Sequence, residues 1–187
     1  GGPMTTHRAL FLDRDGVINR DDGYVRRKQD VHFIEGIFPL TAAAVARGFL
    51  PIVVTYQSGI GRGYYVERQF MRLMRWMKRE FLRRRAPLAA VYFCPCHPEH
   101  GIGRYRRDSP LRKPHPGMLL RAAADFRLDL HRSILVGDAV TDMEAGIAAG
   151  VGKLFYLRHG AAAALPPACG ALREVRRLED IIPALDF

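Results

Sequence analysis

Two aspartates, Asp13 and Asp15, follow a short apolar run and precede a glycine in the stretch ALFLDRDG. Alternate residues of an extended chain share a face about 7 Å apart, so both carboxylates can address one group. One could attack phosphorus and form an aspartyl-phosphate, while the other protonates the leaving alkoxide and later deprotonates water. Two acids beside a phosphate require a cation, and Mg²⁺ prefers oxygen ligands. An ordinary polar turn after a strand would have the same residues. The rest of the chain is needed to distinguish a catalytic acid pair from such a turn.

The elements that would position these acids are short apolar runs that alternate with helical stretches. This pattern predicts an α/β fold, a single doubly wound (Rossmann-like) parallel sheet flanked by helices. We expect strands near 8–13, 50–55, 89–93, 133–137 and 153–157, and helices near 38–47, 66–84, 116–126, 140–149 and 178–184. The long segments 14–37 and 94–115 both follow strands. They should therefore border the carboxyl edge of the sheet, where such folds bind ligands.

Three later strands are also followed by polar side chains. Thr55 ends a buried strand, and its hydroxyl could bind a phosphoryl oxygen or simply form a turn. Arg112 and Lys113 precede a helix whose first turn is set by proline. Lysine suits a phosphoryl group as a point charge, and the arginine fork suits a second phosphate. Asp138 is a candidate metal ligand, and Asp142 is an acid beside it or at the start of the next helix.

Acid pair, hydroxyl, lysine and acid in this order resemble the haloacid dehalogenase superfamily of aspartyl-phosphate phosphohydrolases. The resemblance covers nearly the whole chain. It implies that the catalytic residues are Asp13 as nucleophile, Asp15 as acid/base, Thr55 and Lys113, and that Mg²⁺ is bound by Asp13, Asp15 and Asp138. Phosphatases of the superfamily carry aspartate at the acid/base position, where its ATPases carry threonine. The resemblance therefore implies hydrolysis of a phosphate ester.

Longer matches, FLDRDGVIN at 11–19, QSGI at 57–60 and RKPHPGM at 112–118, resemble the D-glycero-D-manno-heptose 1,7-bisphosphate and histidinol-phosphate phosphatases. The heptose enzymes lack a large cap domain and hydrolyse the C7 phosphate while holding the anomeric phosphate. The resemblance thus implies a role in nucleotide-activated heptose biosynthesis for a surface glycan, lipopolysaccharide or capsule. It also implies four substrate-binding residues, which are Asn19, Gln57, Ser58 and Arg112. Arg112 would hold the retained phosphate.

Two features depart from that family. Tyr56 follows the motif threonine where the family usually has asparagine. The family also commonly binds a loop zinc through two separated pairs of ligands, and this chain has Cys94, Cys96 and His97 in the first half but Ser109 near the expected later thiolates. A closed structural zinc site needs four protein ligands. We therefore expect no structural zinc.

Composition indicates an ordinary globular protein. Its 187 residues with 48% hydrophobic content predict one domain over residues 4–187, and Gly1-Gly2-Pro3 is typical of a tag remnant. No apolar run approaches the ~20 residues needed to span a bilayer. Three cysteines, an odd number, favour a reducing compartment over a disulfide framework. We expect a cytoplasmic protein.

The charge is strongly positive, since 29 Lys and Arg against 19 Asp and Glu give +10. Such a balance favours anionic partners. Much of the positive charge lies on an amphipathic helix, and we interpret its arginines as a solvated face. Aromatic residues are not interleaved with these arginines, as the binding of single-stranded nucleic acid would require. We expect a small phosphorylated sugar as partner, a monomer, and neither membrane nor nucleic-acid binding. A histidinol-phosphate phosphatase, a polynucleotide 3′-phosphatase and a non-enzymatic basic binding module stay open as alternatives.

Overall fold

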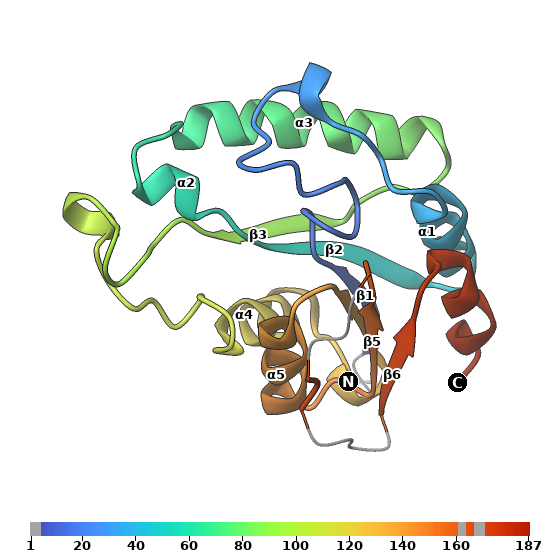
Figure 1. The fold of residues 1–187 in the computed structure, drawn as a ribbon. Helices are drawn as coiled ribbons and strands as arrows, with labels where there is room; N and C mark the ends of the chain where they lie inside the picture. The colour runs from blue at the N-terminus through green and yellow to red at the C-terminus, as the bar shows by residue number, and fades with distance from the viewer. Residues whose placement is uncertain (1–4, 161–163, 167–170) are drawn as a thin grey trace.

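The computed structural model describes residues 5–160, 164–166 and 171–187 (Figure 1). Six parallel strands form one sheet in the order β3-β2-β1-β4-β5-β6. The strands are β1 Arg8–Leu12, β2 Phe49–Tyr56, β3 Ala90–Cys94, β4 Ile134–Gly137, β5 Lys153–Leu157 and β6 Leu172–Val175. The expected α/β fold with a doubly wound parallel sheet is confirmed. The expected tag remnant at residues 1–3 lies outside the described residues.

Helices connect the strands on both sides of the sheet. The α-helices are α1 Ile37–Ala46, α2 Ser58–Gly61, α3 Glu67–Arg83, α4 Gly117–Phe126 and α5 Val140–Ala149. The 3₁₀ helices are η1 Lys28–Asp30, η2 Gly103–Tyr105, η3 Leu130–Arg132 and η4 Leu178–Leu185. All five expected strands and all five expected helical segments are present, with boundaries shifted by at most one residue.

The strand β1 is buried on both faces, as the apolar run predicts. Leu10 and Leu12 contribute to one core, whereas Ala9 and Phe11 contribute to the other. Alternate side chains of a strand point to opposite faces, so a central strand covered on both sides has to be apolar throughout. This places the end of β1, and the acids that follow it, at the middle of the sheet.

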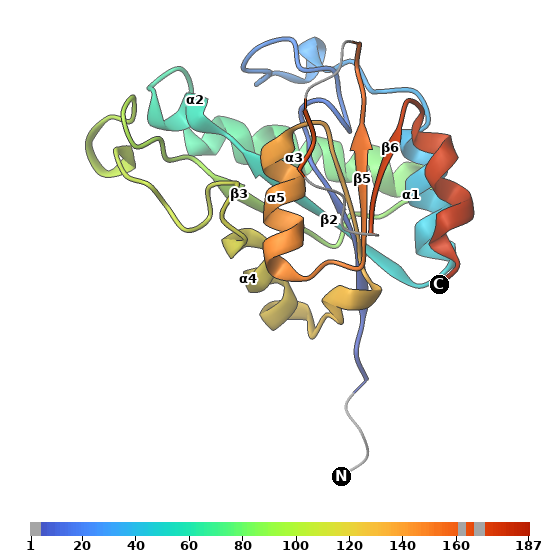
Figure 2. The same cartoon turned by 60° about the horizontal axis from the view of Figure 1, so that its bottom comes forward.

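The two faces of the sheet are covered by different helices. Figures 1 and 2 show α1, α3 and η4 on one face and α4 and α5 on the other. The long α3 buries a stripe of apolar side chains, Phe70, Leu73, Met74, Met77 and Phe81, and exposes most of its arginines. Among the described residues, none of the helices combines the length and apolarity needed to cross a bilayer.

Sequence reasoning misses β6 and α2, and it does not give the helix type of η4. The edge strand β6 reads Leu-Arg-Glu-Val, which is too short and too polar to give a strand signal. The single turn α2 contains two glycines, which disfavour helix in isolation. The helix expected near 178–184 is instead the 3₁₀ helix η4, and Pro183 inside it cannot donate a backbone hydrogen bond.

Candidate active site

Three adjacent strands deliver the candidate residues to one edge of the sheet. Asp13 directly follows β1, Thr55 lies near the end of β2, and Asp138 directly follows β4. Because β1 pairs with both β2 and β4, their carboxyl ends lie side by side at the point where the strand order reverses. A cavity of about 410 Å³ opens there, lined by residues of both long segments.

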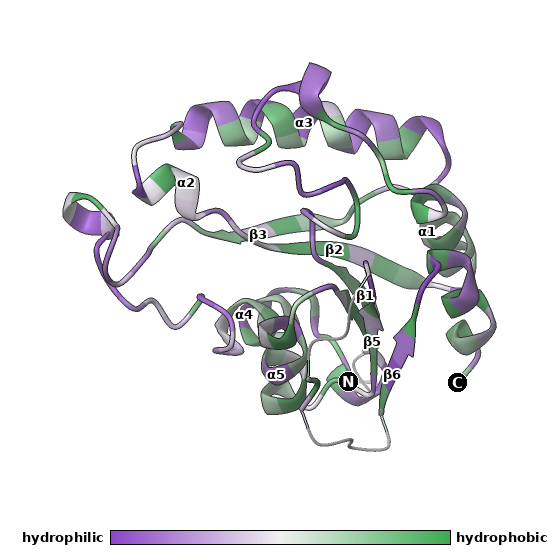
Figure 3. Cartoon of the chain, viewed as in Figure 1, coloured by the Kyte–Doolittle hydropathy of each residue, from purple (hydrophilic) through white to green (hydrophobic). Residues whose placement is uncertain are grey.

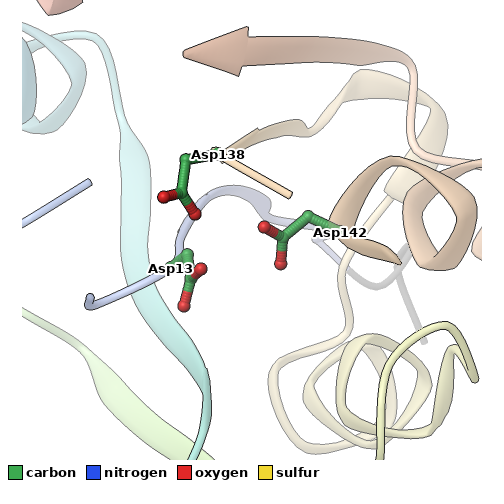
Figure 4. Close-up of side chains that lie close together, drawn as sticks. All are labelled: Asp13, Asp138 and Asp142. Atoms are coloured by element: carbon green, nitrogen blue, oxygen red, sulfur yellow. The ribbon is translucent and has the colours of Figure 1, made fainter. Parts of the chain in front are cut away.

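An acidic cluster forms the floor of this cavity. Asp13, Asp138 and Asp142 each offer one carboxylate oxygen, and these oxygens lie within 4.8 Å of one another (Figure 4). The expected metal ligands were Asp13, Asp15 and Asp138, so the structure brings in Asp142 in addition, while metal binding by Asp15 stays a prediction. Asp142 accepts a hydrogen bond from the Ala139 amide at 3.1 Å, which fixes its side chain in the first turn of α5.

Glycine is required where the backbone passes close to this cluster. Gly16 has a φ of 92°, and a Cβ atom at this residue would overlap the carboxylate of Asp138. Any other residue would be strained in this left-handed conformation and would displace Asp138. The glycine that follows the two acids in the sequence therefore has a physical role in the site.

The cluster carries more negative charge than its surroundings can accommodate. Burial, and then the charge of Asp142, raises the pKa of Asp13 well above its ordinary value. The same two causes raise the pKa of Asp138 to about 6. A divalent cation would relieve this repulsion, and three carboxylates suit Mg²⁺, which takes oxygen ligands.

The raised acid pKa values predict that Mg²⁺ stabilises the protein more as the pH rises. An acid whose pKa is raised on folding contributes stability below its unfolded pKa and loses that contribution as the pH rises through its folded pKa, here about 6 for Asp138. The metal-free protein should therefore lose stability between about pH 4 and pH 6, where Mg²⁺ replaces the lost protons. Melting temperatures with and without MgCl₂, at matched ionic strength, measure this. An equal Mg²⁺-induced increase at about pH 5 and pH 7 would contradict it.

Lys113 is the buried cation of the site. Its Nζ lies 2.5 Å from Asp142 Oδ1 and 3.4 Å from Asp13 Oδ1, and it donates a hydrogen bond to the Val54 carbonyl at 3.0 Å. Burial alone would lower the pKa of Lys113, but the carboxylates of Asp13 and Asp142 raise it above its ordinary value. The ammonium therefore stays charged beside the candidate nucleophile.

Asp15 is held by a set of donors that sequence reasoning only partly anticipates. Asn19 Nδ2 and Gln57 Nε2 each donate to its carboxylate at 3.1 Å. Arg14 donates to Asp15 Oδ1 from Nη2 at 2.8 Å and to the Val25 carbonyl at 2.7 Å, and its side chain is fully buried. An arginine between two aspartates carries no signal of burial, so its role as a positioning residue could not be predicted.

Gln57 links the acid/base candidate to the candidate phosphate-binding hydroxyl. Its Nε2 also donates to Thr55 Oγ1 at 2.8 Å, and its Oε1 accepts a hydrogen bond from the Tyr65 hydroxyl. Burial raises the pKa of Tyr65 to about 12, so the phenol stays protonated as a donor. Tyr65 is the second residue that sequence reasoning missed, because nothing in its local sequence indicates that it reaches the site.

Removing the Tyr65 hydroxyl should loosen this network. Tyr65→Phe leaves the buried Gln57 carbonyl oxygen without its donor, which costs about 1–3 kcal/mol of stability. The amide of Gln57 can then rotate away from Asp15, and we expect kcat to fall about tenfold with KM nearly unchanged. Tyr64→Phe is the matched control, because Tyr64 is half-exposed and its hydroxyl takes no part in the hydrogen bonds of Gln57. Wild-type kcat in Tyr65→Phe would show that the hydroxyl does not position Gln57.

The remaining expected residues differ in their access to the cavity. Ser58 and Arg112 line it, together with Gln57. Asn19 is fully buried and contacts Asp15 from behind, so it supports the acid and does not line the cavity. Arg112 pairs with Asp108, which is outside the acidic cluster, with Nη1 3.6 Å from Asp108 Oδ1.

Comparison with known proteins identifies the family. The HAD-hydrolase-like family profile matches residues 110–166. The chain is 55% identical to D-glycero-alpha-D-manno-heptose-1,7-bisphosphate 7-phosphatase of Burkholderia mallei over 96% of this chain and 94% of that protein. The chain belongs to this family of HAD-like phosphatases. It is also 47% identical to the corresponding beta-anomer phosphatase of Vibrio cholerae, over 81% of this chain and 82% of that protein.

Solved structures agree with this membership of the HAD-like family. A HAD-like protein from Mesorhizobium loti superposes with a TM-score of 0.86 at 34% identity, covering 100% of this chain and 90% of that chain. D,D-heptose 1,7-bisphosphate phosphatase from B. bronchiseptica, complexed with magnesium and phosphate, superposes with a TM-score of 0.81 at 26% identity, covering 95% of this chain and 97% of that chain. The expected resemblance is thereby confirmed.

Tyr56, at which we noted a departure from the HAD-like relatives, lies beside Arg112. Its ring lines the cavity, and the Arg112 Cζ atom is 5.8 Å from the ring centre. An asparagine at this position could not present a flat apolar face to the guanidinium. The tyrosine therefore shapes the part of the cavity beside Arg112.

The loop after β3, where the resemblance would place zinc ligands, is held by direct contacts. Cys94 and Cys96 are buried free thiols. The Tyr105 hydroxyl donates to Glu67 Oε1 at 2.8 Å, and the Ile102 amide donates to the Gly61 carbonyl at 2.8 Å, so the loop is attached to α2 and α3. The absence of structural zinc stays a prediction, which metal analysis of the purified protein tests.

Proposed function

We propose that this protein is a Mg²⁺-dependent phosphatase that removes the C7 phosphate of D-glycero-D-manno-heptose 1,7-bisphosphate. The observation that carries the proposal is the buried Asp13 carboxylate, 3.4 Å from the Lys113 ammonium and part of an acidic cluster on a cavity floor. This arrangement supports a carboxylate nucleophile aimed at a phosphoryl group. The names of the relatives support the choice of substrate.

The reaction has two steps. A carboxylate oxygen of Asp13 attacks phosphorus, the bond from phosphorus to the C7 oxygen breaks, and Asp15 gives its proton to the departing alkoxide. Asp15 then takes a proton from a water molecule that attacks the aspartyl-phosphate, which releases phosphate and restores Asp13. Asp13, Asp138 and Asp142 would hold Mg²⁺, which would supply positive charge for the phosphoryl oxygens.

Hydrogen-bond donors around Asp15, and the Lys113 ammonium beside Asp13, position the groups that take part in these steps. Arg14, Asn19 and Gln57 keep the Asp15 carboxylate in one orientation, so the same group can serve as acid and then as base. Lys113 offsets the charge that develops on the transferred group. Thr55 is fully buried and its hydroxyl oxygen accepts the Gln57 hydrogen bond, so its contact with a phosphoryl oxygen stays a prediction. These roles follow from position and chemistry.

The second phosphate of the substrate is assigned to Arg112. This guanidinium lines the same cavity as Asp13 but lies on the segment after Ser109, beside Tyr56. A planar fork can grip a phosphate with two hydrogen bonds, which favours a bisphosphate over a monophosphate. The product keeps the anomeric phosphate, which suits later activation by a nucleotide for lipopolysaccharide or capsule.

A substrate panel tests this proposal. We expect phosphate release from heptose 1,7-bisphosphate at a kcat/KM at least about tenfold above that for fructose 1,6-bisphosphate, histidinol phosphate and a 3′-phosphorylated oligonucleotide. We expect the α anomer to be the better substrate, because the relative at 55% identity is named for it. Comparable rates on all compounds would refute the heptose assignment. A preference for histidinol phosphate or the oligonucleotide would establish that alternative in its place.

A further inference from the structure

A second cavity, of about 460 Å³, lies between the η1 segment and the outer side of α3. We call it the basic cavity. Its charged lining residues are all cations, and they are Arg26, Arg27, Lys28, Arg72 and Arg79. Its floor is formed by Leu73 and Trp76, and Gln29 and Gln69 complete it. Figure 3 shows η1 in hydrophilic colours above α3, whose ribbon alternates hydrophilic and hydrophobic colours.

The positive charge of the basic cavity is largely uncompensated. Arg27 pairs with Asp30 at 2.9 Å. Within the described part of the chain, the other four cations form no ion pair, and no acidic side chain lines the cavity. Cations on a convex helix would diverge into solvent, whereas these converge on a hollow from two segments far apart in the sequence. Such convergence creates a positive potential that attracts an anion.

The spacing of the cations indicates more than one phosphate. Arg72 and Arg79 are seven residues apart on α3, which at 1.5 Å per residue separates them by about 10 Å along the axis. Arg26 and Lys28 line the same cavity from the segment that contains η1. A single phosphate can reach one of these groups at a time, but a chain of two or three phosphates can contact several.

The floor of the cavity adds an aromatic surface. Trp76 is half-buried and stacks one face on Phe33, with ring centres 5.8 Å apart and an interplanar angle of 20°. The indole is thereby held rigid beside Arg72 and Arg79, on the same side of α3. A rigid indole next to cations suits a ligand that joins a planar ring to phosphates.

We propose that the basic cavity binds a nucleoside di- or triphosphate. Its volume is in the usual range for small-molecule sites, about 300–1,000 Å³. The site is distinct from the catalytic cavity, since the two share no lining residue. The proposal does not depend on the proposed function, because it concerns binding at a different surface.

A small molecule fits the basic cavity better than a nucleic acid does. Strand binding stacks successive bases on several aromatic side chains along a groove, and Trp76 is the one aromatic residue among those lining this cavity. The η1 segment also closes one side, which limits the length of chain that could lie in it. We therefore argue for a nucleotide and make an oligonucleotide one arm of the test.

Trp76 provides a direct reporter, because it is the single tryptophan of the chain. We expect ADP, added to the full-length protein, to change its fluorescence saturably and to bind at least about tenfold more tightly than orthophosphate or adenosine. A fluorescence change with equal affinity for ADP and orthophosphate would overturn the proposal, as would no change at millimolar ADP. Tighter binding of a single-stranded oligonucleotide than of ADP would also overturn it.

Paired charge reversals on one helix provide the control. R72E/R79E should weaken ADP binding at least about tenfold while leaving phosphatase activity unchanged. R75E/K78E makes the same change of net charge at exposed residues of α3 outside the cavity, and should weaken binding by no more than about threefold. Equal effects of the two variants would show general charge attraction and overturn the site. Circular dichroism of both variants verifies that α3 is retained.

Discussion

Asp13→Asn should abolish phosphate release, lowering kcat by about 10⁴-fold or more. The neutral amide cannot form the bond to phosphorus, and it removes one of three charges that would hold Mg²⁺. The effect should be larger than for any substitution that only displaces a neighbour, because Asp13 would supply the attacking oxygen. Asp142, which also pairs with Lys113, lies in the first turn of α5 and not at the end of β1. Rates on the heptose bisphosphate and on a general aryl phosphate should fall alike.

The same variant should fold at least as well as the wild type when no metal is present. Burial and neighbouring acids raise the pKa of Asp13, so neutralising this side chain removes repulsion within the fold. Lys113 keeps an ion pair with Asp142. Asp180→Asn, an exposed aspartate on η4, is the matched control for both activity and melting temperature. Rapid-quench mass spectrometry of the wild type should find phosphate attached to Asp13.

Turnover in Asp13→Asn close to that of the control would mean that the nucleophile is another residue. Attachment of phosphate to Asp138 or Asp142 in the wild type would lead to the same conclusion. Loss of turnover together with loss of the folded state would not separate the two roles, which is why the melting temperature is measured in the same preparation.

The parts of the site that sequence could predict are those set by strand ends. Asp13, Thr55 and Asp138 follow or end apolar runs, and parallel strands bring their carboxyl ends to one edge regardless of the details of packing. Lys113 could be nominated as a cation that precedes a proline-started helix, but its approach to Asp13 and Asp142 could not, because a pattern of apolar residues does not show how the turn before α4 folds.

The parts that could not be predicted depend on contacts between segments. The approach of Asp142 to Asp13 follows from the turn between β4 and α5, where the Ala139 amide fixes the carboxylate. The hydrogen bond of Tyr65 to Gln57 depends on the turn after α2, where the Tyr64 amide donates to the Gly59 carbonyl at 2.8 Å. The burial of Arg14 depends on the Val25 carbonyl, eleven residues later. Periodicity in the sequence carries none of this information.

The basic face of α3 is likewise predictable from the sequence in part only. The sequence predicts a solvated basic face on α3, and most of that face is indeed exposed. It could not predict that the η1 segment lies across one side of the helix, so that Arg72 and Arg79 border a hollow while Arg75 and Lys78 do not.

Lys113→Met should lower kcat about 10³-fold or more on every phosphate monoester. The substitution keeps the length of the side chain but removes the ammonium that contacts Asp13 and Asp142. Breaking a buried ion pair from one side typically costs about 3–5 kcal/mol, so the metal-free variant should also be less stable. Mg²⁺ should recover part of the stability but little of the activity, because the missing Lys113 ammonium also compensates charge on the transferred phosphoryl group.

Arg112→Ala is the informative partner of this variant, because the two cations are adjacent in sequence but have different assignments. Arg112 lies beside Tyr56, whereas Lys113 is buried between two acids. Its removal should raise KM for the bisphosphate about tenfold or more, with a smaller loss of kcat because binding remote from the reacting phosphate also helps to orient it. A monophosphate of the same sugar lacks the group that Arg112 would hold and should be hydrolysed at nearly the wild-type rate.

The deciding quantity is the ratio of kcat/KM for bisphosphate to that for monophosphate. Lys113→Met should leave this ratio nearly unchanged, since it impairs the reacting phosphate common to both substrates, whereas Arg112→Ala should lower it about tenfold or more. A ratio that Arg112→Ala does not change would show that this arginine does not recognise a second phosphate. The natural substrate would then be a monophosphate, and histidinol phosphate would become the better assignment for a cavity whose catalytic floor is the same.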